Sequence, residues 1–153
     1  MARVVGEWSA TMNFSAESGS PFTPRVFGAT TSVSSGTSGS LRADYLGVPI
    51  GLEDETLLRF FNTDAFAVPA IGAFGTSPRN IIIGPGGYVF NAQFSRDMRI
   101  GGNRSVGLTI NANNLFNTTR WTAIDTNVNS LTFGQVTRFA PMRTVTLATR
   151  FRF

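Results

Sequence analysis

Four stretches of this chain alternate between apolar and polar residues for ten positions or more, which constrains the fold more than any other feature. They cover roughly residues 5–16, 88–100, 105–116 and 142–153. Neighbouring side chains of a β-strand point to opposite sides, so this alternation predicts strands with one apolar and one polar face. Strands of soluble proteins typically have only about 5–6 residues. The sequence therefore predicts an all-β fold built from about four unusually long strands.

The side chains on the two faces fit two architectures. In residues 88–100 one face carries Tyr88, Phe90, Ala92, Phe94, Met98 and Ile100, with Arg96 as an exception, and the other carries Asn91, Gln93, Ser95, Asp97 and Arg99. An outer-membrane β-barrel has such strands, of about 9–11 residues, with apolar side chains facing lipid and polar ones facing the lumen. A soluble antiparallel sandwich with its apolar face inward has the same periodicity. Periodicity alone leaves both open.

The connections between the strands favour the barrel. Residues 101–105, GGNRS, form a short turn, whereas residues 17–87 and 117–142 are long connections. Outer-membrane barrels combine short periplasmic turns with longer extracellular loops. If the C-terminus is periplasmic, the short turn is periplasmic and both long connections are extracellular. We therefore expect an antiparallel transmembrane β-barrel segment of the outer-membrane type.

The first long connection is heterogeneous. Residues 34–40 form a flexible low-complexity segment, and residues 79–87 contain a β-branched run ended by a turn, so part of the connection is expected to extend the flanking strands. Residues 52–62 predict a short helix, because acidic residues favour a helix start. A cation site formed by Glu53, Asp54 and Glu55 is the weaker alternative to a solvated helix start.

The composition excludes several functions. The chain has no Cys and no His, which removes thiol nucleophiles, His bases and most zinc sites, and we expect no enzymatic activity, cofactor or metal. The 13 basic residues are all Arg and are scattered singly, so nucleic-acid binding is not expected. The chain has no run of 18 apolar residues, so no transmembrane helix is predicted. Its first ten residues, MARVVGEWSA, are not a signal peptide.

Five segments resemble TonB-dependent receptors, most closely the Oar-like subgroup, whose longer members carry an N-terminal carboxypeptidase-regulatory-like domain. They are SGSPFTPRV (18–26), FNTDAFAVP (61–69), NANNLFNTTRW (111–121), FGQVT (133–137) and PMRTVTLATRFRF (141–153). The resemblance lies in the last barrel strands of that family and covers nearly the whole chain from about Gly6.

That resemblance implies a barrel of about 22 strands in the outer membrane of a Gram-negative bacterium, with a plugged lumen. It also implies nutrient import driven by the proton-motive force. The implied partners are outer-membrane lipid, the barrel assembly machinery, an unidentified nutrient ligand, and the TonB complex through an N-terminal part. Residues 1–153 contain no recognisable plug domain, TonB box or signal peptide. Because four strands cannot close a barrel, we expect a C-terminal fragment, with a truncated gene or a subunit as alternatives.

Specific residues receive roles in this interpretation. The last strand resembles the assembly β-signal through Val145, Leu147, Thr149, Phe151 and Phe153. Trp8, Tyr88 and Trp121 are expected at the membrane interface, and Arg96 near the periplasmic rim. The Asn residues of NNLFN (113–117) suit a turn out of the strand. Besides transport, a barrel that anchors an adhesin-like surface protein and a soluble binding module remain competing functions.

Overall fold

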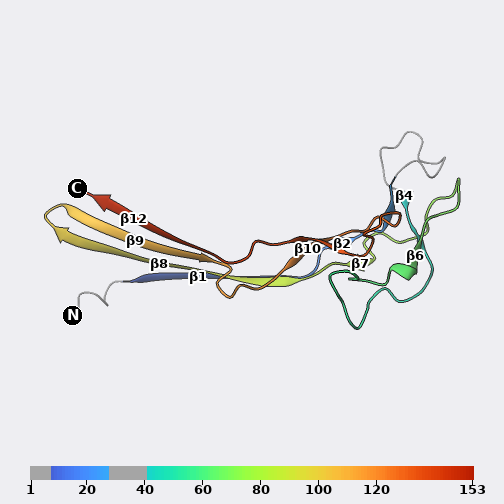
Figure 1. The fold of residues 1–153 in the computed structure, drawn as a ribbon, viewed down its shortest axis with the longest axis horizontal. Coiled ribbons are helices and arrows are strands. Elements are labelled where there is room, and N and C mark those ends of the chain that lie inside the picture. Colours follow the sequence, from blue (N-terminus) through green and yellow to red (C-terminus); the bar gives the residue numbers. More distant parts are fainter. Residues whose placement is uncertain (1–7, 28–40) are drawn as a thin grey trace. The chain divides into compact units, whose positions relative to one another are not determined.

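The computed structural model describes residues 8–27 and 41–153, which belong to two compact units (Figure 1). The sheet unit comprises Met1–Glu17, Gly87–Thr119 and Pro141–Phe153, and the connector unit comprises Ser18–Gly86 and Arg120–Ala140. The predicted strand residues 5–7 and the low-complexity segment 34–40 lie outside the described residues.

The sheet unit contains one four-stranded antiparallel sheet with the order β1-β8-β9-β12. Its strands are β1 (Ser9–Glu17), β8 (Gly87–Gly101), β9 (Arg104–Asn113) and β12 (Thr144–Arg152). The four predicted long strands and the all-β antiparallel architecture are thus confirmed. The predicted third strand ends earlier than expected, because Asn114 leaves the extended conformation with a φ of 51°.

The register of the strands aligns side chains of one kind across the sheet. Met12 faces Ala92, Ala92 faces Ala112, and Ala112 faces Val145, so this row is apolar across all four strands. We call the side that contains this row the apolar face and the opposite side the polar face. The sheet is open, with β1 and β12 as its edge strands.

The turn between β8 and β9 is as short as the sequence predicts. Gly101 and Gly102 have φ values of 134° and 59°, a region that glycine adopts readily. The register shifts between Arg99 and Gly101, so β8 ends in a bulge beside the turn. We call this end of the sheet the turn end.

The described residues of the connector unit form four two-stranded ladders and one short helix. The pairs are β2 (Pro21–Phe22) with β7 (Ile82–Ile83), β3 (Arg25–Val26) with β4 (Leu41–Arg42), β5 (Asp44–Tyr45) with β6 (Phe66–Ala67), and β10 (Trp121–Ile124) with β11 (Val136–Phe139). The 3-10 helix η2 spans Thr63–Ala65. Among the described residues, no helix is long and apolar enough to cross a membrane.

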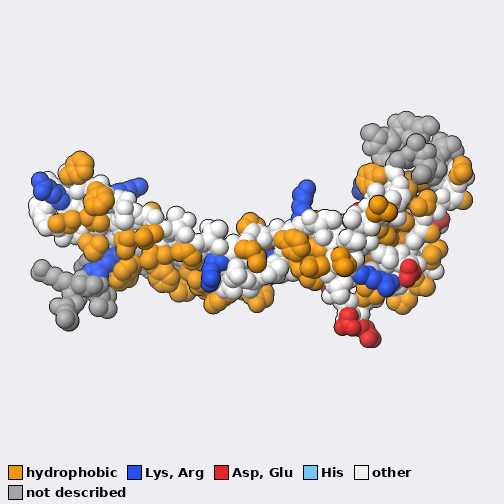
Figure 2. All heavy atoms as spheres, viewed as in Figure 1, with side chains coloured by type: hydrophobic (Ala, Val, Ile, Leu, Met, Phe, Trp, Pro, Cys, Tyr) orange, Lys and Arg blue, Asp and Glu red, His pale blue; other side chains and the backbone are white. Residues whose placement is uncertain are grey.

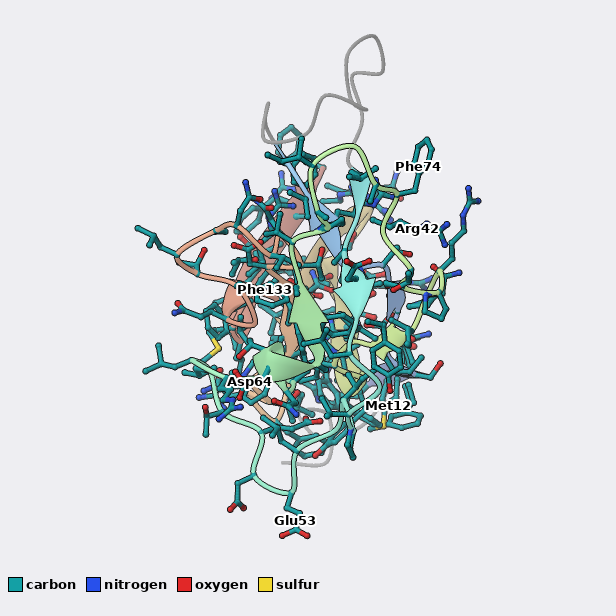
Figure 3. All side chains as sticks on the ribbon, turned by 90° about the vertical axis from the view of Figure 1, so that its right-hand side faces the viewer. Met12, Arg42, Glu53, Asp64, Phe74 and Phe133 are labelled. Carbon is teal, nitrogen blue, oxygen red and sulfur yellow. The ribbon has the colours of Figure 1, made fainter. Side chains whose placement is uncertain are left out.

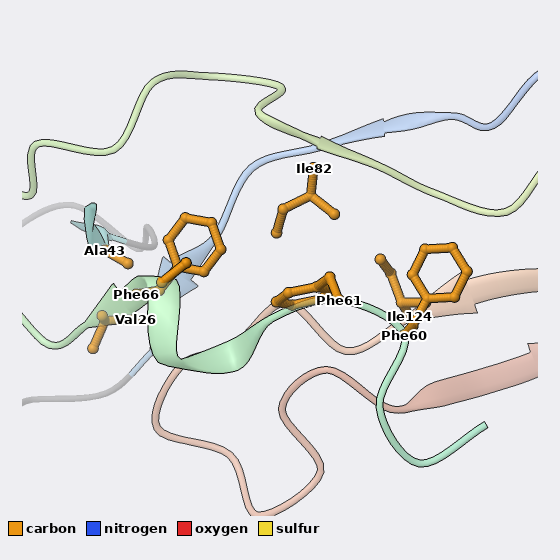
Figure 4. Packing of buried hydrophobic residues seen from close by; sticks show 8 residues of the cluster. Val26, Ala43, Phe60, Phe61, Phe66, Ile82 and Ile124 are labelled. Atoms are coloured by element: carbon orange, nitrogen blue, oxygen red, sulfur yellow. The ribbon is translucent and has the colours of Figure 1, made fainter. Parts of the chain in front are cut away.

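A hydrophobic core joins the two long connections (Figure 4). Its buried members are Val26, Ala43, Phe60, Phe61, Ala65, Phe66, Ile82 and Ile124. Ile124 comes from the second connection and the others from the first. Phe61 and Phe133 make an edge-to-face contact with ring centroids 5.2 Å apart, a favoured geometry for aromatic pairs. The two predicted loops therefore fold together as one packed unit.

The helix predicted for residues 52–62 is wrong. No helix forms in this segment, and only the short η2 follows it. Phe60 and Phe61 are both buried in the core. The backbone N–H of Phe60 donates to the Gly134 carbonyl at 2.8 Å, and that of Asn62 donates to the Ile50 carbonyl at 2.8 Å. These long-range hydrogen bonds and the burial of two consecutive rings replace the helical bonds.

The β-branched run at residues 81–83 pairs as expected from the sequence. In the β1·β8 ladder Glu17 faces Gly87, and in the β2·β7 ladder Phe22 faces Ile82. Phe22 lies five positions after Glu17, and Ile82 lies five positions before Gly87, so the two ladders have the same register. The Gly84 N–H donates to the Ser20 carbonyl at 2.8 Å. The pairing of β1 and β8 thus resumes within the first connection.

Candidate functional site: the two faces of the sheet

The apolar face exposes large hydrophobic side chains instead of burying them. Met12, Phe14, Val145, Leu147 and Phe151 are each more than half exposed, and Figure 2 shows hydrophobic side chains along the sheet. Soluble monomers rarely expose a contiguous apolar surface larger than a few hundred Å². The apolar face therefore has the character of a surface that contacts lipid.

Aromatic rings gather where the apolar face ends near the start of β8. The ring centroid of Phe14 lies 6.4 Å from that of Tyr88 and 6.5 Å from that of Phe90, and Phe90 lies 5.3 Å from Phe116. The sequence analysis assigned an interface role to Tyr88 but missed its three neighbours. Phe116 lies beyond the end of β9, so only the fold shows that it belongs to this aromatic cluster.

The residues predicted as the assembly signal run along the β12 edge of the apolar face towards the turn end. Val145, Leu147, Thr149 and Phe151 occupy alternate positions of β12 and share the apolar face. Phe153 follows the strand and is 98% exposed. The five residues therefore form one accessible row, as a recognition signal requires, and the assembly role remains a prediction.

The length of the apolar face matches a bilayer. Twelve positions separate Tyr88 from Ile100 along β8, which corresponds to about 40 Å of strand. At the tilt of about 40° that barrel strands adopt, this length spans about 30 Å along the membrane normal, the thickness of the hydrocarbon core. Both ends of the apolar face therefore fall at interface level.

Arg96 is a charged residue within the apolar face. It is only 8% exposed, and its guanidinium carbon lies 5.9 Å from the centroid of the Trp8 ring. It faces Leu108 and lies eight positions from Tyr88 but four from Ile100. Arg96 thus occupies the part of the apolar face nearer the turn end, where a charge costs less than at the bilayer centre.

Trp121 does not lie on the sheet. It belongs to β10 in the connector unit, where its ring packs edge-to-face against Phe60 with centroids 5.9 Å apart. It is half-buried and packs against the hydrophobic core. Its ring stabilises the connector unit, so its position does not support the predicted interface role.

The polar face carries Asn, Gln, Ser and Thr side chains from all four strands. One row contains Thr11, Gln93, Asn111 and Thr146. A hollow of about 680 Å³ lies over this part of the sheet, lined among others by Gln93, Asp97, Thr109 and Arg150. These side chains suit a surface in contact with water rather than a packed protein core.

A glycine separates two opposite charges on the polar face. Asp97 faces Gly107 across β8 and β9, and Gly107 faces Arg150 across β9 and β12. A Cβ atom at position 107 would lie 2.6 Å from Asp97 Oδ1. The missing side chain of Gly107 therefore leaves the space that the Asp97 carboxylate occupies.

The NNLFN segment fixes the exit from β9. Asn114 and Asn117 have φ values of 51° and 54°, which confirms the predicted left-handed turn residues. Asn114 is 4% exposed; its N–H donates to Asn91 Oδ1 at 2.9 Å, and its Oδ1 accepts from the Thr118 N–H at 2.9 Å. Its Nδ2 donates to the carbonyls of Thr118 and Pro141. Asn114 is therefore a structural turn residue with all its polar atoms satisfied.

Asp125 organises a turn of the connector unit. Its carboxylate accepts hydrogen bonds from the Asn127 N–H at 2.9 Å and the Thr132 hydroxyl at 2.6 Å. Partial burial raises the pKa of Asp125, but hydrogen bonds from Ser130, Thr132 and the Asn127 backbone outweigh it and lower the pKa below its ordinary value of 3.8.

The acidic residues of the first connection do not form a metal site. Figure 3 shows Glu53 pointing outward at the tip of a loop, and Glu53, Asp54 and Glu55 are all exposed. Within residues 8–27 and 41–153, no group of three or more His, Cys, Asp or Glu side chains is arranged to hold a metal ion. Asp64 pairs with Arg59 at 3.1 Å.

Comparison with known proteins agrees with the geometry of the sheet. A protein-family model described as "Outer membrane beta barrel domain" matches residues 1–146. No curated protein and no solved structure shows significant similarity to the chain.

Proposed function

The chain belongs to the outer membrane beta barrel domain family, and from this premise we propose that it forms part of the barrel wall of a TonB-dependent receptor. In this proposal the apolar face contacts lipid and the polar face lines the lumen through which a nutrient passes. The connector unit lies outside the cell, and the C-terminus and the turn end lie in the periplasm. No enzymatic step is part of the proposal.

The observation that carries the transport function is the continuous polar face. Its rows of Asn, Gln, Ser and Thr cross all four strands, and the hollow over them is lined mostly by small or polar residues, with Leu108 as the exception. Water-filled or plugged barrels have such an interior. The segments that resemble TonB-dependent receptors add support, because they include β12 and the turn that leaves β9.

The open edges of the sheet imply further strands. Unpaired backbone groups of an edge strand are costly in lipid, at several kcal/mol each, and the smallest closed membrane barrels have about eight strands. We propose that the neighbours of β1 and β12 belong to the same longer polypeptide, with this chain as its C-terminal part. In this proposal the N-terminal part of that polypeptide contains the plug and contacts the TonB complex.

Growth phenotypes test the transport function. Strains that lack either the gene for this chain or the gene for TonB are grown on a panel of ferric siderophores, cobalamin and glycans as limiting nutrients. The proposal expects at least one nutrient on which both strains fail and on which only the first is rescued by the gene for this protein. If the strain without this gene grows normally on every nutrient that requires TonB, the transport function is wrong.

The connector unit favours one alternative, a surface protein that the barrel anchors. It exposes the large apolar residues Leu58, Ile71, Phe74 and Leu131, which a soluble surface seldom displays together. An adhesive role predicts weaker attachment of cells when Leu58, Phe74 and Leu131 are replaced by Ser, without any change of nutrient uptake. Unchanged attachment together with normal surface display contradicts this alternative.

A further inference from the structure

A second hollow lies at the turn end of the sheet, where the apolar face meets charged residues. Its volume is about 420 Å³, and its lining consists of Ile100, Arg104, Ser105, Phe151, Arg152 and Phe153. Three of these side chains are large and apolar and two are guanidinium groups. The hollow is therefore amphipathic, with cations beside exposed hydrocarbon.

The charge around this hollow is one-sided. Arg99, Arg104, Arg150 and Arg152 lie at the turn end, whereas Asp97 is the only carboxylate among the described residues of β8, β9 and β12. Arg104 and Arg152 form no ion pair with a carboxylate among the described residues. Arg104 and Arg152 are thus exposed cations that are available to an anion from outside the chain.

The position of the hollow matches the headgroup level of a membrane. Ile100 marks the end of the apolar face, about 30 Å along the membrane normal from Tyr88 when the strands tilt as barrel strands do. Phe151 and Ile100 are each about two-thirds exposed. In a bilayer these side chains meet the upper part of acyl chains, while the guanidinium groups reach the phosphates.

We propose that this hollow binds the phosphate headgroup of an anionic phospholipid. Arg104 and Arg152 donate charge-assisted hydrogen bonds to the phosphate oxygens, a geometry for which guanidinium groups are well suited. Ile100, Phe151 and Phe153 contact the first carbons of the acyl chains. The inference rests on the membrane-spanning sheet and not on the proposed transport function, so either can fail without the other.

Lipid binding to the intact protein tests this inference. The protein as encoded by its gene, solubilised in a neutral detergent, is titrated with phosphatidylglycerol and separately with phosphatidylcholine, and bound lipid is counted by native mass spectrometry. We expect tighter binding of phosphatidylglycerol. The R104Q/R152Q variant is expected to lose this preference, with about fivefold weaker binding for each arginine removed.

Matched variants separate a site from general electrostatics. R79Q/R138Q removes the same charge from two exposed arginines of the connector unit and is expected to keep the preference. R104K/R152K retains the charge but lacks the planar guanidinium groups. It is expected to bind phosphatidylglycerol less tightly than the native chain but more tightly than R104Q/R152Q. Equal losses in R104Q/R152Q and R79Q/R138Q, or equal binding of both lipids by the native chain, would overturn the proposal.

The remaining alternatives are other occupants of the hollow. Inorganic phosphate is expected to compete weakly, because it lacks acyl chains. If it displaces the lipid at equal concentration, the hollow binds a free anion and the lipid assignment is wrong. If R104Q/R152Q binds lipid normally but fails to assemble in the outer membrane, the hollow serves the assembly machinery instead.

Discussion

The guanidinium carbon of Arg96 lies 5.9 Å from the centre of the Trp8 ring, so an aromatic side chain covers the charge on the apolar face. Cation–π contacts contribute about 0.5–2 kcal/mol, with the larger values in desolvated positions. This contact allows an arginine to remain among residues that contact lipid.

A double-mutant cycle of W8A and R96M measures this contact. We expect a coupling of about 1–2 kcal/mol in urea unfolding of the lipid-embedded protein. F14L with R96M is the control pair and should be additive, since Phe14 faces Phe90, six positions from Arg96 along β8. A coupling near zero for Trp8 with Arg96 would show that the ring does not stabilise the charge.

Substitutions of Asn114 test the exit from β9. N114A loses the side-chain hydrogen bonds and strains the left-handed backbone, and we expect it to lower the free energy of unfolding by about 3 kcal/mol. N114G keeps the backbone free of strain and should lose about 2 kcal/mol. N117G, which removes only the acceptor for the Arg143 N–H, should lose about 1 kcal/mol or less. Equal effects of all three in urea unfolding contradict this account.

Two glycines that lie close to other atoms should respond differently to alanine. A Cβ at position 19 would lie 1.6 Å from the Gly84 carbonyl oxygen, which belongs to the backbone and cannot move away easily. G19A should therefore lower the free energy of unfolding by about 3 kcal/mol. G107A meets only the flexible carboxylate of Asp97 and should lose less than about 1 kcal/mol. Similar losses in thermal unfolding of the two variants would be inconsistent with the packing.

Acid should loosen the connector unit through Asp125. Because its pKa is lowered in the folded state, the stabilising contribution is complete above pH 3.8 and is lost as the pH falls through the lower folded value. In a W8F background Trp121 is the remaining tryptophan and reports unfolding of this unit by fluorescence. D125N should cost about 1 kcal/mol or less at neutral pH, because the site is partly hydrated.

D125N should also flatten the loss of stability between pH 4 and pH 2. If the native chain and D125N lose stability equally over this range, other groups cause the acid sensitivity of the connector unit.

The assembly role of the last strand is tested in cells. F153A in the protein as encoded by its gene is expected to lower its abundance in the outer membrane severalfold, because the terminal aromatic residue of the predicted signal is lost. F139A removes an equally large exposed ring from β11 and serves as the control. Normal abundance of F153A in the outer-membrane fraction would remove the assembly role from Phe153.

The sheet is predictable from sequence because its information is local. Alternation fixes which residues of a strand share a face, so the rows of Met12, Ala92, Ala112 and Val145 follow once the strands are adjacent. The connector unit is not predictable in this way. Its core takes Val26, Phe61 and Ile124 from distant positions without any period, and its segments are too short to show one.

The same reasoning explains where the expectations and the structure differ. The charge and spacing of residues 52–62 favour a helix locally, but burial of Phe60 and Phe61 favours an extended path. Trp121 resembles an interface residue by type, and only its contact with Phe60 reveals its place in a core. Phe116 joins the aromatic cluster at Tyr88 through the turn after β9, which no local pattern marks.

The shared core of the two long connections limits how the sequence of the connector unit can change. Phe61 and Phe133 make an edge-to-face contact between segments that are separated by a complete β-hairpin in the sequence. A substitution in the core of one connection therefore changes the packing of the other, and the two cannot vary as independent loops. Selection for a new ligand, or escape from a phage or antibody that recognises this surface, would have to replace the connector unit as a whole or confine its changes to the exposed tips.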